Sequence, residues 1–132
     1  MNLTGQHERA ETTIQSVVLV PVVFLLAFMC FHFGSLYHQT HIAQLAANRG
    51  ATVGSAFAYS HESAKQAQSE AERVARELGS ALTSIPEVSY RDQGLVVKVS
   101  LRTSTAISFL PSIATAEAWR PLESFRLEQD RK

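Results

Sequence analysis

The sequence predicts an α+β protein with a long N-terminal helix, half in a membrane and half protruding, a second helix, and a small antiparallel sheet of about three strands. Three patterns lead to this prediction. The run from Thr12 to Gln44 contains no Asp, Glu, Lys or Arg. Apolar residues then recur at helical spacing as far as Ile85. After Pro86 they alternate with polar residues, which is the period of a strand.

The charge-free run predicts a single transmembrane helix over residues 13–37. As an α-helix, Ile14 to Tyr37 would be about 36 Å long, enough to cross a hydrocarbon core of about 30 Å. A buried helix of a water-soluble protein would normally carry a polar face, whereas Val17 to Phe31 is apolar on all sides. Pro21 lacks the N–H that a helix interior needs, so we expect a kink or local loosening there.

A cleavable secretory signal is the alternative interpretation, and it fits less well. Such signals have a positive n-region, a short apolar core and a small-residue cleavage site. Here Glu8 and Glu11 accompany Arg9, the apolar run is long, and FHFGSLYHQT offers no A-x-A site. We therefore expect residues 1–12 to be a short cytoplasmic leader. Residues 38–132 are then an extracytoplasmic helical stalk with a small α+β domain.

The helical pattern continues beyond the apolar run and predicts the stalk. Gly50 and Gly54 form a G-x-x-x-G pair, which can bring helices close. Outside a membrane, simple tolerance of glycine is the favoured interpretation. The apolar stripe of this stalk consists of Ile42, Leu45, Ala46, Val53, Ala56 and Phe57.

A second helix follows SHES, and Pro86 is predicted to end it because a proline disfavours helix at the preceding Ile85. Its small side chains suit close packing against another helix or a small sheet. Glu70 and Glu72 each lie about one turn before an arginine, so ion pairs are expected on the wet face. The expected apolar positions are Ala67, Ala71, Val74, Leu78, Ala81 and Ile85.

Strand-like alternation follows Pro86. Every second residue is apolar in VSY and LVVKVSLR, and Asp92-Gln93-Gly94 supplies a turn, so a hairpin with one buried face is predicted. A third strand is expected in SIATAEAWRP, whose alternating alanines would let a helix approach closely. Between them, Ile107, Phe109 and Leu110 lie in a predicted loop. They either plug the small core, which we favour, or form a docking patch for a membrane or partner surface.

Composition argues against several functional classes. The chain has 12 basic and 12 acidic residues, which are interspersed beyond His41, a pattern unlike a nucleic-acid footprint. The single cysteine, Cys30, allows neither an internal disulfide nor a paired-cysteine metal site. His38 and His41 are spaced as metal ligands can be, but no acidic third ligand is near, and interfacial polar residues are the preferred interpretation. Because no catalytic motif is present, we expect no enzyme, metal or cofactor.

Three stretches of the chain resemble the TadE-like proteins of tight-adherence (Flp) pilus systems. VVLVPVVFLLAFMCFHFGSLY is similar to the family's apolar run, with Pro21 and the closing Phe33-Gly34 pair in place. AQLAANRGATVGSAF resembles the small-residue helix that follows in that family. LVVKVSLRTSTAISFLPSIATAEAWRPLESFR resembles its closing module of a strand, a proline-containing link and an alanine-rich strand.

Two positions depart from the family pattern. Aligned on Pro21, the family's glutamate falls at Gln15 and its cleavage-site glycine at Ala10. In pilin-like proteins that resemble this one, a prepilin peptidase cuts before the mature helix, and the glutamate pairs with a neighbour's new N-terminus. Neutral Gln15 donates hydrogen bonds but does not supply that charge, which puts processing between Ala10 and Glu11 in doubt.

The resemblance implies a non-enzymatic, single-pass minor pilin or pseudopilin of pilus assembly, with roles in secretion and adhesion. Its expected partners are membrane lipid, other pilin-like or Tad assembly proteins, and further copies of itself, but no nucleic acid. The alternative is a membrane-anchored scaffold or binding subunit that is not processed and does not enter a fibre. Both imply the cytoplasmic (inner) membrane, with the N-terminus inside and the bulk outside or at the cell surface. The residues expected to make helix-packing contacts are Gln15, Pro21, His32, Gly34 and Ser35.

Overall fold

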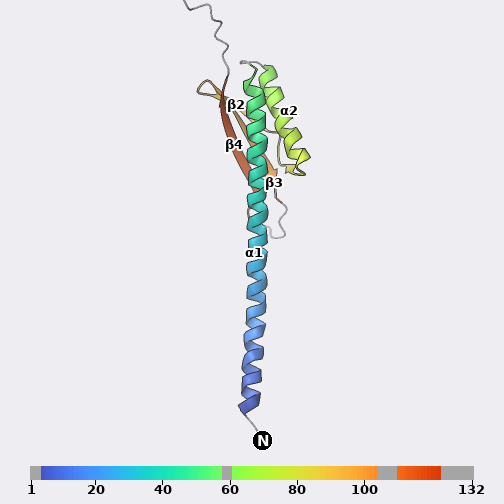
Figure 1. The fold of residues 1–132 in the computed structure, drawn as a ribbon, viewed down its shortest axis with the longest axis vertical. Coiled ribbons are helices and arrows are strands. Elements are labelled where there is room, and N and C mark those ends of the chain that lie inside the picture. The colour runs from blue at the N-terminus through green and yellow to red at the C-terminus, as the bar shows by residue number, and fades with distance from the viewer. Residues whose placement is uncertain (1–3, 58–60, 104–109, 123–132) are drawn as a thin grey trace, which may run out of the picture. The chain divides into compact units, whose positions relative to one another are not determined.

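The computed structural model describes residues 4–57, 61–103 and 110–122, with side chains from Gln15 onward. The chain divides into two compact units, Met1–Gly34 and Ser35–Lys132. The predicted α+β class is confirmed, although the antiparallel sheet has four strands in place of about three. The elements are α1 (Thr4–Ser55), α2 (His61–Glu77), β1 (Ala81–Leu82), β2 (Glu87–Arg91), β3 (Gly94–Arg102) and β4 (Ile113–Pro121), and Figure 1 labels all of them except β1.

Within the second unit, α1 directs mainly small side chains into the core. The predicted stripe is correct at Ile42 and Ala46 but wrong at Leu45, Ala56 and Phe57, which are exposed. The buried side of α1 consists mainly of small residues, and the facing strand β4 presents alanines. Small side chains on both elements let the helix and the sheet approach each other closely. The buried positions of α1 in this unit are Ile42, Ala43, Ala46, Ala47, Gly50, Ala51, Gly54 and Ser55.

Helix α2 ends at Glu77, earlier than the predicted end at Ile85. The chain leaves the helix through Gly79, whose φ of 72° is a left-handed conformation that glycine adopts without strain. Two backbone bonds complete a Schellman motif: the Gly79 N–H donates to the Arg76 carbonyl at 2.9 Å and the Ser80 N–H to the Ala75 carbonyl at 3.0 Å. A glycine cap therefore ends α2 before Pro86 is reached.

The residues predicted to extend this helix lie elsewhere. Leu78 and Ile85 are exposed, and Ala81 begins β1. Their helical spacing is a coincidence of a short strand and a turn, which an apolar pattern alone does not distinguish from helix. The other predicted positions of α2 are buried, together with Ser63 and Ala75.

Strand β3 is the centre of the sheet. It pairs antiparallel with β4 along its whole length and, on its other edge, with β2 and β1. The predicted hairpin joins β2 to β3 through Asp92 and Gln93, whose φ values of 49° and 58° are both positive, as a type I′ turn requires. That turn sets the register in which Val88 faces Val97.

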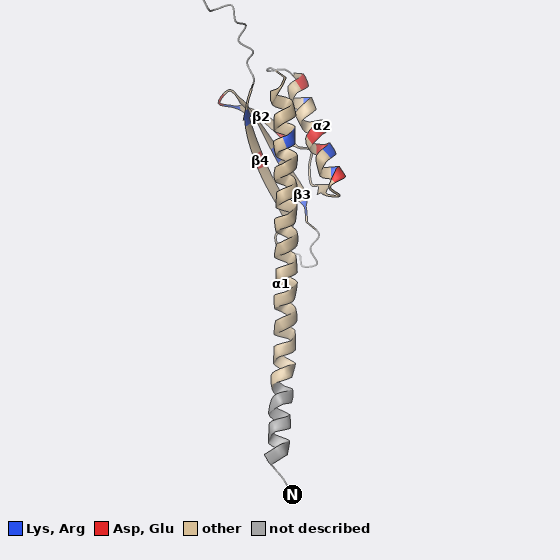
Figure 2. Ribbon diagram, in the orientation of Figure 1, with Lys and Arg blue, Asp and Glu red and all other residues tan. Residues whose placement is uncertain are grey.

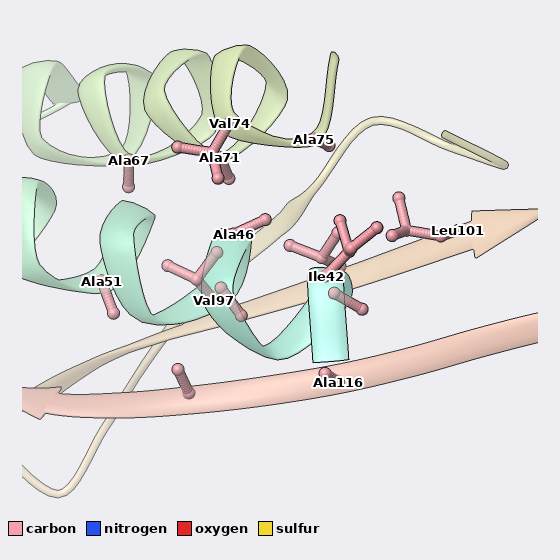
Figure 3. Close-up of a cluster of buried hydrophobic side chains, with 14 of the residues drawn as sticks. Ile42, Ala46, Ala51, Ala67, Ala71, Val74, Ala75, Val97, Leu101 and Ala116 are labelled. Atoms are coloured by element: carbon pink, nitrogen blue, oxygen red, sulfur yellow. The ribbon is translucent and has the colours of Figure 1, made fainter. Parts of the chain in front are cut away.

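The core lies on one face of this sheet, beneath both helices (Figure 3). The predicted alternation is confirmed at Leu95, Val97, Val99 and Leu101, which are fully buried, and on β4, whose alternating alanines are buried. It is wrong at Val96, which is also buried, and at Tyr90, which is exposed. Gln44 also connects α1 to β4, since its Nε2 donates to the Glu117 carbonyl at 3.3 Å. The second unit is thus one small core held between two helices and a sheet.

Gly50 and Gly54 are required for packing, and the interpretation that they are merely tolerated is wrong. A Cβ on Gly50 would lie 2.7 Å from the Ala67 carbonyl oxygen, and one on Gly54 would lie 2.3 Å from Leu95 Cδ2 and 2.7 Å from Ala67 Cβ. The Ser63 hydroxyl donates to the Gly54 carbonyl at 2.7 Å, which satisfies a buried acceptor near the end of α1.

Candidate membrane and assembly surface

The first unit presents α1 as an exposed apolar helix. Among the described residues, one helix, within Gln15–Ser55, is long and apolar enough to cross a membrane. Phe24 is 72% exposed and Phe31 is 78% exposed, and most of the large side chains between Val17 and Phe33 are exposed as well. Removing such a side chain from water is worth about 1.5–3 kcal/mol. A surface of this kind is therefore stable only where lipid or other helices cover it.

Pro21 lies inside this helix and is exposed. The helix continues through it, although a proline has no N–H to donate to the carbonyl one turn earlier. Membrane helices accept such a residue because neighbouring groups can satisfy the freed carbonyl.

The polar positions of this segment differ in exposure. Gln15 is exposed, whereas His32 is only 3% exposed and lies edge-on to Phe33, with ring centroids 5.8 Å apart. His32 Nε2 has no hydrogen-bond partner among the residues that the structure describes. The packing roles of Gln15 and His32 stay predictions.

The other sequence-predicted site residues fall into three groups. A Cβ on Gly34 would meet nothing within 4 Å, and Ser35 is half-buried. Ala10 and Glu11 belong to the backbone of α1, but their side chains lie outside the described part of the chain. In the proposed docking patch Leu110 is half-buried, while Ile107 and Phe109 are outside the described residues.

One histidine of the stalk, His41, contacts an aromatic ring. Tyr37 and His41 lie edge to face with ring centroids 4.7 Å apart, one helical turn from each other. His38 and His41 are both exposed. Within the described residues, no group of three or more His, Cys, Asp or Glu side chains is placed to hold a metal ion.

Charged residues are distributed unequally between the two helices (Figure 2). Helix α2 carries the predicted ion pairs: Arg73 contacts Glu70 at 2.7 Å, and Arg76 contacts Glu72 at 3.4 Å. The hydrogen bond from Arg73 lowers the pKa of Glu70 below its ordinary value. By contrast, Arg49 is the only Asp, Glu, Lys or Arg between Thr12 and Phe57.

These features define a class of protein in which one helix suited to a membrane continues into a small α+β domain. The family model described as TadE-like protein matches residues 11–52, which is less than half of the chain. The resemblance is therefore confirmed over this segment, and proteins of this family are components of pilus assembly. Neither the curated proteins nor the solved structures gave a match. Resemblance of the closing module, from Leu95 to Arg126, stays a prediction.

The sequence pattern did not show which side of the stalk is buried and which side is exposed. The stripe that it selected mixed buried Ile42 with exposed Leu45, so it did not separate the side facing the sheet from the side facing away. The available signal was the lack of charge, which continues well past Gln44 to Arg49.

Proposed function

We propose that this chain is a single-pass membrane component of Tad (Flp) pilus assembly, a minor pilin or pseudopilin that acts through packing of its N-terminal helix. The observation that carries the proposal is the exposed apolar length of α1 in the segment that matches the TadE-like family.

The proposed topology places residues 13–37 in the cytoplasmic membrane, the short N-terminus inside and the α+β domain outside. Two kinds of contact would hold α1 to neighbouring pilin-like helices. Gly34 allows close approach of another backbone, because nothing lies within 4 Å of the position its Cβ would take. Exposed Gln15 supplies hydrogen bonds where the family has a charge.

Deletion and complementation in the native host test this function. Loss of the gene is expected to abolish or sharply reduce Tad pili, and the wild-type chain restores them. Gly34→Leu is expected to fail to restore them, because a large side chain would hold a neighbouring helix away. Leu25→Ile on the same helix is the matched control and is expected to complement. Normal pili in the deletion strain would refute the proposal.

The alternative, an unprocessed scaffold subunit that never enters a fibre, is separated by mass spectrometry of the protein purified from membranes. Loss of the first ten residues, ending at Ala10, supports the pilin-like route. An intact N-terminus supports the scaffold. Single-cysteine labelling at Ser69→Cys in a Cys30→Ser chain tests the topology, because an impermeant maleimide reaches this exposed position only if the domain is outside.

A further inference from the structure

Three strands of the second unit come level with one another at one end of the sheet. Ala81 of β1 pairs with Arg102 of β3, and Arg102 pairs with Ile113 of β4. Residues paired in this way point to the same face of a sheet. Because Leu101, next to Arg102, is buried in the core, these three residues lie on the opposite face. We call Ala81, Arg102 and Ile113 the end row, and all three are exposed.

A hydrogen bond fixes the level of the end row along α1. Ser80 directly precedes Ala81, and its hydroxyl donates to Gln39 Oε1 at 2.8 Å. Gln39 follows Tyr37 by two residues, which is about 3 Å along a helix axis. Helical side chains lean toward the N-terminus of their helix, so the Gln39 amide lies nearer still to the level of Tyr37. Ala81 is therefore close to the level of Tyr37, and both belong to the second unit.

A second contact gives the level of the other end of the row. Strand β4 runs in the direction of α1, because β3 starts beside the end of α1 and β4 is antiparallel to β3. The Gln44 amide donates to the Glu117 carbonyl. Glu117 follows Ile113 by four strand residues, about 14 Å, and Gln44 follows Tyr37 by seven helical residues, about 10 Å. Ile113 thus also lies within about one helical turn of the level of Tyr37.

The level of Tyr37 is where the proposed membrane span ends, so this inference rests on the proposed function. A bilayer has a hydrocarbon core of about 30 Å and is about 40–45 Å thick with its headgroups, which leaves a polar layer of about 5–7 Å on each side. A residue level with Tyr37, or a few ångströms beyond it, lies within that layer. We propose that the end row lies among the lipid headgroups and that Arg102 binds their phosphates.

The chemistry of the end row suits this environment. Arg102 is exposed and makes no ion pair with any residue that the structure describes, whereas Lys98 on the same face of β3 pairs with Glu87 at 3.6 Å. A guanidinium presents its N–H donors in a fork that matches two phosphate oxygens. Ala81 and Ile113, on either side of Arg102, are apolar, and Ile113 is 51% exposed. An arginine between apolar side chains fits the boundary between lipid phosphates and acyl chains.

The depth of single labels in a membrane tests the placement with the full-length chain. Cys30→Ser removes the only natural thiol, and Ile113→Cys or Ala81→Cys then carries a bimane fluorophore. The chain is reconstituted in vesicles of phosphatidylethanolamine and phosphatidylglycerol that include lipids with a nitroxide on the headgroup. Both labels are expected to be quenched. Glu117→Cys is the matched control on the same face of β4, about 14 Å from Ile113, and is expected to escape quenching.

A charge variant tests the role of Arg102. In the labelled Ile113→Cys chain, Arg102→Gln is expected to lower the ratio of quenched to unquenched label about fivefold, the value of one arginine near an anionic surface. Arg91→Gln is the control and is expected to have no effect. Arg91 is also exposed on this face, but it pairs with Gly94 at the other end of β3, about 27 Å from Arg102.

The outcomes separate this inference from the proposed function. Equal quenching at Ile113→Cys and Glu117→Cys, no quenching at either end-row position, or an unchanged ratio in Arg102→Gln would overturn the lipid contact. If that occurs while the chain resists alkaline carbonate extraction and supports piliation, the proposed function stands. Release from the membrane by carbonate would instead refute the anchor on which both rest.

Discussion

Gly50 of α1 lies directly against the Ala67 carbonyl of α2, at a distance that leaves no room for a side chain. A Cβ on Gly50 would be 2.7 Å from that oxygen and 3.0 Å from Ala71 Cβ. The oxygen belongs to the backbone of a helix, so it cannot move aside as the end of a flexible side chain would. The two helices of the second unit can therefore pack this closely only because residue 50 has no side chain.

Gly50→Ala is expected to destabilise the second unit by about 2 kcal/mol. Overpacking against a rigid neighbour costs about 3 kcal/mol, and the better helix propensity of alanine returns about 1 kcal/mol. Denaturant unfolding of the detergent-solubilised chain measures the difference. Gly34→Ala is the control: it meets no neighbouring atom within 4 Å and should leave this transition unchanged. Equal stability of Gly50→Ala and wild type would contradict the close approach.

Ser63→Ala is expected to cost about 1 kcal/mol, because the Gly54 carbonyl loses the buried hydroxyl that donates to it at 2.7 Å and keeps the Phe57 N–H, which donates at 3.2 Å. Ser69→Ala is the matched change on the same helix. Its hydroxyl donates to the Gln66 carbonyl at an exposed position, so the loss should be below about 0.5 kcal/mol. Thermal unfolding of the two variants side by side makes the comparison.

Gln93→Gly is expected to stabilise the hairpin between β2 and β3 by about 0.5–1 kcal/mol. Gln93 has a φ of 58°, where a side chain clashes with the backbone and glycine does not. Asp92→Gly should gain less, since Asp enters the left-handed region more readily than Gln. Chemical unfolding of both variants measures the order of the gains, and a larger gain at Asp92 would contradict this account of the turn.

Stability should fall at acidic pH partly through Glu70. Arg73 lowers the pKa of this carboxyl from 4.5, so the folded state holds the proton less tightly than the unfolded state. The contribution is fully present well above pH 4.5 and is lost as the pH falls through the lowered pKa. Glu70→Gln should flatten the acid limb of a plot of stability against pH. An unchanged acid limb in the Glu70→Gln chain would contradict this contribution.

Much of the fold follows from local signals in the sequence. The charge-free run predicts the long helix, the alternation after Pro86 predicts β2 and β3, and the turn at Asp92 joins them. These predictions hold because each depends on residues adjacent in the chain. The predicted end of α2 was wrong because two local signals disagreed. The apolar spacing continued past Gly79, whereas Gly79 favours a helix end, and the backbone conformation shows that the helix ends at the glycine.

The candidate site was less predictable because it depends on tertiary contacts. The alanines of β4 and α2 decide which side of α1 is buried. As a result the small Ala43 is buried and the large Leu45 is exposed, although hydrophobicity alone would bury the leucine first. Gly50 and Gly54 show the same limit, since their necessity arises only when Ala67 and Leu95 are brought against them. The apolar helix itself was predictable because its length and composition are properties of consecutive residues and need no tertiary contact.

The alanine lining of α1, α2 and β4 also determines how much disorder the core loses when it forms. A leucine or methionine gives up rotamer freedom on burial, at a cost of about 0.5–2 kcal/mol, whereas alanine has none to give up. Positions such as Ala43, Ala71 and Ala116 are therefore ordered almost free of that entropic cost. Such a small core gains little from each residue, but little of the gain is lost to freezing side chains in place.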